Sequence, residues 1–153
     1  MARRLLKLAT MKRIVDALEL LTAQHEQLER LLQKTDTVPV AQRALALGEL
    51  ADQLATHLEA EQQLLELLQV KDYADDHARV RAALADVLAL DLDSGEMPER
   101  IRTLDEILSK HSTWQEDVLF VMLAETVEPD VLELVGSLLA EWAAGSSCLA
   151  IAA

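Results

Sequence analysis

The sequence contains a single cysteine, Cys148, and few of the residues that interrupt helices. One cysteine cannot form an internal disulfide, which we expect of a protein in a reducing compartment such as the cytoplasm. Aromatic residues make up only 3% of the 153 residues, with four glycines and three prolines. Leucine, alanine, glutamate, glutamine and arginine dominate instead, and these residue types favour helices. The sequence therefore predicts an all-α protein, with residues 1–153 in one domain.

Long apolar runs and positive charge are also scarce. No run of about 18 uninterrupted apolar residues occurs, so we expect no membrane span. The net charge of −13 argues against nucleic acid as a partner, because such binding depends on Lys and Arg contacts to phosphate. Residues 1–13 are the exception, with five basic residues and no acidic one. Their apolar portion is too short for a signal sequence, and we expect a solvated lead-in to the first helix.

Apolar residues recur at alternating steps of three and four, the pattern of a helix with one buried face. Breaks in this pattern fall near Pro39, at Lys71-Asp72, over residues 91–97 and at Glu128-Pro129. The expected helices cover residues 11–34, 40–70, 73–90, 98–125 and 128–144. On the fourth of these helices the inward positions are expected to be Ile101, Leu104, Leu108, His111, Gln115, Val118 and Met122.

Helices of this length with short connections predict an antiparallel, up-down-up-down four-helix bundle followed by a short C-terminal fifth helix. The bundle is expected over residues 11–126 and the accessory helix over 128–144. The apolar tail, residues 145–153, is unlike the rest and is a candidate surface for a protein partner. Apolar residues outside the inward positions leave a homo-oligomer open.

The four histidines each lie on the inward face of a different expected bundle helix. In antiparallel helices, residues at equal depth are symmetric about the turn that joins them. The midpoints of successive histidine pairs are positions 41, 67 and 94, each within a few residues of a predicted break. The four imidazoles are therefore expected to lie in one layer of the core. The four residues are His25, His57, His77 and His111.

Glu61 follows His57 by four residues, which in a helix amounts to a rotation of about 40°, so both side chains project from the same face. Several unpaired imidazoles buried together would be costly, and a metal removes that cost by accepting their lone pairs. Imidazole with carboxylate suits iron, zinc, copper or manganese, whereas calcium prefers oxygen ligands. The pattern thus predicts a transition-metal site.

Four segments carry a family resemblance: DALELLTAQHEQLERLL, HLEAEQQLLELL, DDHARVRAALADVL and HSTWQEDVLFVML. In order and spacing they resemble the hemerythrin-like (HHE) cation-binding domain, over residues 12–125. The resemblance implies a non-haem di-iron centre that binds dioxygen, nitric oxide or peroxide, or that handles iron. A single iron or another divalent transition metal remains an alternative. By position, the implied ligands are His25, His57, Glu61, His77 and His111.

The sequence departs from the family at the sixth ligand position. Gln115 stands four residues after His111, where the family has glutamate, and Glu116 follows it. In a regular helix five residues rotate by about 140°, so Glu116 reaches the site only if the helix is locally distorted or turned. Three outcomes are open: a complete site that uses Glu116, a two-metal site with one bridging carboxylate, or a weakened or single-metal site.

Tyr73 lies one turn before His77. Its hydroxyl is a candidate ligand or hydrogen-bond donor, and the alternative is an aromatic plug with its hydroxyl toward solvent. Three functions remain open at this point: a metal protein that binds or senses a diatomic gas, an oxidase or ferroxidase that uses the same centre, and a bundle with a degenerate site that serves as a structural or partner-binding module.

Overall fold

The structure is a computed structural model that describes residues 15–71 and 73–151, with side chains described as far as Gly145. Every regular element in these residues is helical, which confirms the all-α prediction. None of these helices is long and apolar enough to cross a membrane. The helices are α1 (Ala17–Thr37), α2 (Val40–Leu67), α3 (Ala74–Leu88), α4 (Met97–Trp114), the π-helix η1 (Gln115–Leu119), α5 (Phe120–Thr126) and α6 (Pro129–Ile151).

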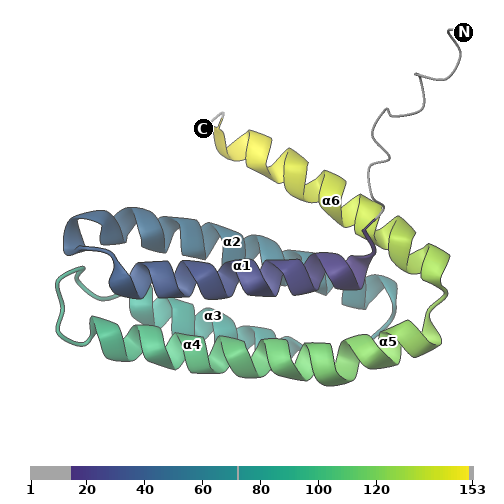
Figure 1. Ribbon diagram of the computed structural model, residues 1–153, viewed down its shortest axis with the longest axis horizontal. Helices are drawn as coiled ribbons and strands as arrows, with labels where there is room; N and C mark the ends of the chain where they lie inside the picture. Colours follow the sequence, from purple (N-terminus) through teal and green to yellow (C-terminus); the bar gives the residue numbers. More distant parts are fainter. Residues whose placement is uncertain (1–14, 72, 152–153) are drawn as a thin grey trace, which may run out of the picture.

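The helices α1 to α4 run lengthwise beside one another, and η1 and α5 continue the line of α4 (Figure 1). α1 packs against α2 and α4, and α3 packs against α4. The connections α1–α2 and α3–α4 lie at one end of the molecule, and the connections α2–α3 and α5–α6 lie at the other end (Figure 1). The middle parts of α1, α2, α3 and α4 therefore lie at a similar depth along the molecule.

Both ends of α1 have local causes in the sequence. Asp16 caps the helix, because its Oδ1 accepts a hydrogen bond of 2.8 Å from the backbone N–H of Glu19. At the other end Val38 is extended (ψ 149°), since a residue before proline avoids the helical region. The helix therefore begins at Ala17, later than the expected residue 11. The basic segment 1–13 lies outside the described residues.

Two apolar clusters fill the interior, and the histidine positions lie between them along each helix. The first cluster includes Leu28, Leu54, Leu58, Val80 and Leu108. The second includes Leu21, Leu64, Leu65, Leu119 and Leu139. A layer of polar side chains is thus enclosed by hydrocarbon on both sides, where unsatisfied polar atoms are most costly.

The π-helix changes which residues face inward after Gln115. The N–H of Phe120 bonds to the carbonyl of Gln115, five residues earlier, so one residue more than usual is fitted into this turn. The predicted inward residues Val118 and Met122 are instead 53% and 44% exposed, and this part of the prediction was wrong. Their places are taken by buried residues one position later, Leu119 and Leu123.

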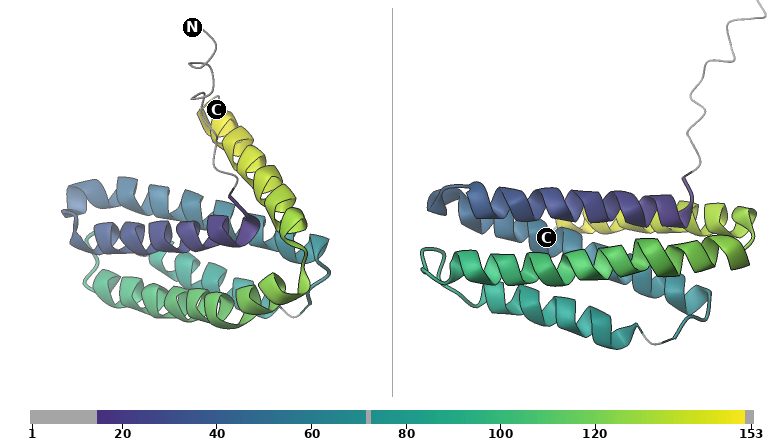
Figure 2. Two further views of the ribbon diagram at one scale, coloured as in Figure 1. Left: turned by 45° about the vertical axis from the view of Figure 1, so that its right-hand side comes forward. Right: turned by 60° about the horizontal axis from the view of Figure 1, so that its bottom comes forward.

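The C-terminal helix is longer than expected. α6 runs to Ile151 instead of ending near residue 144, since a lone glycine at position 145 and two serines do not stop a helix. The helix crosses α1 and α2 obliquely near the start of α1 (Figure 1; Figure 2). It buries Leu132, Val135 and Leu139 there. The expected tail 145–153 is thus helical backbone as far as Ile151, and its side chains from Ser146 on lie outside the described part.

Candidate metal centre

The carboxylate of Glu61 lies at the centre of the four histidines, and each of its oxygens faces two imidazoles. Oε1 lies 3.1 Å from Nε2 of His57 and 3.5 Å from Nε2 of His25. Oε2 lies 2.9 Å from Nε2 of His77 and 3.2 Å from Nε2 of His111. All five side chains are buried. The histidines come from α1, α2, α3 and α4, so the one-layer arrangement expected from the sequence is present.

Several of these atoms have no hydrogen-bond partner, although no solvent reaches them. They are Nε2 of His25, His57 and His111, and Oε1 of Glu61. Nδ1 of His77 is a fifth such atom, on the side of its ring away from Glu61. A buried polar atom without a partner costs about 1–3 kcal/mol. Ligand atoms of His25, His57, Glu61 and His111 lie within 4.8 Å of one another, so these residues could hold a metal ion. A metal held there would satisfy the unpartnered atoms of these four residues at once.

The pKa shifts of Glu61 and His57 favour metal ligation, whereas the pKa shift of His111 favours a proton that competes with a metal. Burial alone raises the pKa of Glu61, but the surrounding imidazoles outweigh burial and hold that pKa well below its usual range. Burial lowers the pKa of His57, which keeps its lone pair free. Burial also acts to lower the pKa of His111, but Glu61 and Asp76 outweigh it and raise that pKa. At neutral pH the layer thus contains an ionised carboxylate, the charge that a cation needs.

Three of the imidazoles also contact a polar side chain through Nδ1, the ring nitrogen that does not face Glu61. Nδ1 of His57 donates to Oε1 of Gln24 at 2.9 Å. Nδ1 of His25 lies 2.6 Å from Oε1 of Glu116. Nδ1 of His111 lies 2.5 Å from Oδ2 of Asp76.

These contacts favour the tautomer with its proton on Nδ1. Carboxylate and amide oxygens only accept, so each of these rings donates from Nδ1 in that tautomer, while its Nε2 lies 3.1–3.5 Å from the carboxylate of Glu61. The Nε2 lone pair then points at the centre of the layer, as in most histidine metal sites. Nδ1 of His77 has no partner. The sequence offered no signal for Gln24 or Asp76, because their contacts cross between helices and depend on packing.

Gln115 and Glu116, whose roles the sequence left open, lie at different depths. Gln115 is the inward residue, 1% exposed, and its Oε1 has no hydrogen-bond partner. The side chain of Glu116 is 38% exposed, and its carboxylate contacts His25 from the outer side. The structure does not bring Glu116 to the Nε2 nitrogens, because the π-turn begins at Gln115 and leaves Glu116 on the outer flank.

Tyr73 contributes its ring but not its hydroxyl to the layer. The ring centroid lies 5.2 Å from that of His77, whereas the hydroxyl donates to Glu66 at 3.5 Å, on the exposed side. This arrangement matches the aromatic plug with its hydroxyl outward. Phe120 stacks parallel to the His25 ring with centroids 6.0 Å apart. Aromatic rings therefore cover two of the four imidazoles.

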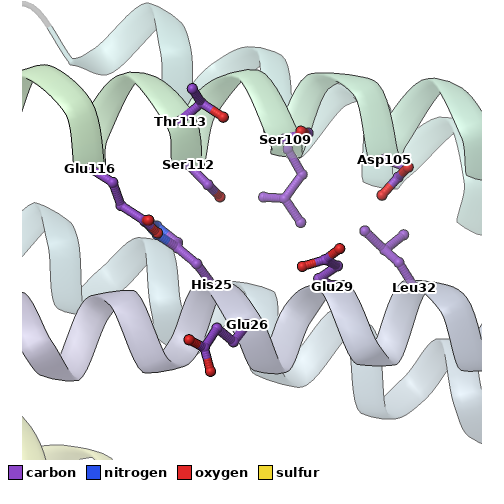
Figure 3. A pocket seen from close by; sticks show the side chains of 10 residues that line it. His25, Glu26, Glu29, Leu32, Asp105, Ser109, Ser112, Thr113 and Glu116 are labelled. Atoms are coloured by element: carbon purple, nitrogen blue, oxygen red, sulfur yellow. The ribbon is translucent and has the colours of Figure 1, made fainter.

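A cavity of about 280 Å³ between α1 and α4 leads from the surface to His25 (Figure 3). Four carboxylates line it, from Glu26, Glu29, Asp105 and Glu116, together with Ser109 and Ser112. In Figure 3, His25 and Glu116 point toward each other across the gap between the two helices. A negatively charged cavity that ends at a histidine of the layer attracts cations rather than anions.

The position of Glu116 leads to a first prediction. If Glu116 orients His25 and does not ligate, Glu116→Gln should lower metal affinity about 10- to 100-fold and leave the number of metals bound at saturation unchanged. Competition with a chelator of known affinity measures the first quantity, and elemental analysis measures the second. Asp117→Asn, an exposed neighbour, is the control. Loss of one whole metal at saturation would show instead that Glu116 is a ligand.

The chain matches no protein-family model, and comparisons with curated proteins and with solved structures found no match either. The chemistry of the layer indicates what the site could bind. A buried carboxylate among four imidazoles, three of them in contact with a polar group at Nδ1, is a donor set for a transition metal.

Proposed function

We propose that this chain is a hemerythrin-like metal-binding protein, an antiparallel four-helix bundle that holds a non-haem di-iron centre in its core. One observation carries the proposal: a single buried carboxylate divides four imidazoles into two pairs, with two Nε2 atoms directed at each oxygen. A carboxylate placed in this way would join two ions, one beside each oxygen. A single ion held by His25, His57, Glu61 and His111 is the alternative.

The residues divide naturally between the two ions. His25, His57 and Oε1 of Glu61 would hold one ion, and His77, His111 and Oε2 of Glu61 would hold the other. Imidazole with carboxylate suits iron, and it also accepts other divalent transition metals. Each half has three protein ligands, which leaves positions open for a small molecule.

An iron pair, when bound, supplies a redox-active centre for dioxygen, nitric oxide or peroxide. The surrounding residues favour binding or sensing over catalysis. Among the described residues, the buried polar side chains besides the four histidines and Glu61 are those of Gln115 and of Thr35, whose hydroxyl donates to the carbonyl of Leu31. No further acid or base thus lies in the core to move protons for a reaction.

The acidic cavity favours a second candidate, a ferroxidase or related oxidase that uses the same centre. A route lined by Glu26, Glu29 and Asp105 would deliver ferrous ions repeatedly. A third candidate is a structural or partner-binding bundle with a degenerate site, which Gln115 supports. Ferrous oxidation that continues well beyond two irons per chain would favour the oxidase, and a chain that binds no metal would favour the structural module.

A gas titration tests the binding function. We expect protein loaded anaerobically with ferrous iron to bind nitric oxide, with a change in the visible spectrum that saturates and reverses when the gas is removed. The metal-free protein serves as the blank, and Glu116→Gln loaded to the same iron content serves as a matched sample. An iron-loaded protein whose spectrum does not respond to nitric oxide or to dioxygen would contradict the proposal.

A further inference from the structure

Gln115 is a buried residue at the edge of the histidine layer, and its side-chain amide lacks a hydrogen-bond partner for its oxygen. Its side chain is 1% exposed and its Oε1 has no hydrogen-bond partner. It lies one helical turn after His111, at the residue where the π-helix begins. A buried amide oxygen without a partner costs about 1–3 kcal/mol unless a ligand or water satisfies it. A π-turn within an α-helix frequently marks a functional position.

The charges around the layer do not balance once two divalent ions are bound. The ions bring four positive charges, and the four imidazoles are neutral when they ligate. The carboxylates that touch these imidazoles belong to Glu61, Glu116 and Asp76, which supply three negative charges. Glu26, Glu29 and Asp105 also line the cavity that reaches His25, but they are exposed and water screens them. Inside the layer one positive charge remains, and an uncompensated buried charge is expensive.

We propose that the metal-loaded centre binds one small monocarboxylate, of the size of formate or acetate, beside Gln115. This inference rests on the proposed function and names a ligand class for the same centre. The bound anion neutralises the remaining charge and supplies the oxygen ligands that Gln115, a neutral amide, does not supply. The amide of Gln115 donates an N–H to the anion, since a half-turn about its last torsion exchanges oxygen and nitrogen.

Burial limits the size of the ligand. The five residues of the layer and Gln115 are each at most 5% exposed, and Phe120 covers the ring of His25. The cavity that reaches His25 is acidic, so it slows the arrival of an anion and also weakens its binding, to the extent that solvent does not screen these carboxylates. Binding is therefore to be measured at equilibrium, with formate as the probe.

The test uses equilibrium dialysis of radiolabelled formate against protein loaded anaerobically with ferrous iron. We expect the parent to bind one formate per loaded chain and the metal-free chain to bind none. Gln115→Glu supplies the missing negative charge itself. It should bind formate about tenfold more weakly, because the glutamate carboxylate then repels a second anion from the same position. Gln53→Glu, at an exposed position on α2, makes the same change in net charge and should bind formate as the parent does.

Gln115→Met gives a second measurement that does not introduce a charge. It should retain two irons but bind formate about tenfold more weakly, the effect of one lost hydrogen bond to a charged group. A parent that binds two irons but no formate, or variants at Gln115 that bind formate as tightly as the parent, would overturn the anion site alone. A parent that binds no iron would overturn the proposed function and this inference with it.

Discussion

Replacing Glu61 with glutamine should abolish binding of both metal ions. The carboxylate faces all four Nε2 atoms at 2.9–3.5 Å, so its loss removes a ligand from each half of the centre together with the negative charge closest to both ions. We expect affinity to fall by more than the roughly 10- to 100-fold that removal of an outer partner costs. Elemental analysis of iron per chain after anaerobic loading and gel filtration measures the effect.

The matched control lies on the same helix. Glu59→Gln removes an identical charge from an exposed position of α2, where the carboxylate accepts only a 3.4 Å hydrogen bond from Gln63. This variant should bind as much iron as the parent. Circular dichroism establishes that both variants keep their helix content. A Glu61→Gln protein that still holds two irons would show that the carboxylate does not join the ions.

The second large effect is expected at Gly136, where α6 crosses the start of α1. A Cβ at this position would lie 2.4 Å from the carbonyl oxygen of Val15 and 2.7 Å from the backbone nitrogen of Ala17. These are backbone atoms beside the capping residue Asp16, so they move only at the expense of the cap. Gly136→Ala should lower the free energy of unfolding by about 1–3 kcal/mol, as overpacked cores do. Urea denaturation measures this quantity.

Gly145→Ala provides a control on the same helix with the opposite sign. Nothing lies within 4 Å of a Cβ built there, so the variant gains only the better helix propensity of alanine, up to about 1 kcal/mol. If both substitutions raised the free energy of unfolding, α6 would not pack against α1 as described. A lower free energy of unfolding for Gly136→Ala alone would support the close crossing of α6 and α1.

The sequence was sufficient to predict that the chain is helical and which residues form the polar layer, but not where α1 begins or where α6 ends. Leucines at steps of three and four identify a buried helical face whatever the partner helix is. A histidine in that pattern therefore has a predictable direction. His57 and Glu61 are four residues apart in a helix, so the helical repeat alone predicts that their side chains project from the same face. The structure places the four histidines and Glu61 together for this reason.

The parts that sequence patterns missed depend on tertiary packing. A regular repeat cannot indicate where a helix accommodates an extra residue, so the π-turn at Gln115 was not foreseen and Val118 and Met122 were expected inside. Contacts between helices, such as that of Asp76 with His111, leave no periodic trace either. The position of Glu116 depends both on the π-turn and on its contact with His25 of another helix. Its role therefore could not be decided from the sequence spacing alone.

The central claim is that four histidines and one carboxylate hold a pair of metal ions. Its most direct test is native mass spectrometry of the full chain after anaerobic loading with ferrous iron and removal of excess metal. We predict two irons per chain in the parent. A chain that keeps its helix content but retains one iron or none would contradict the claim.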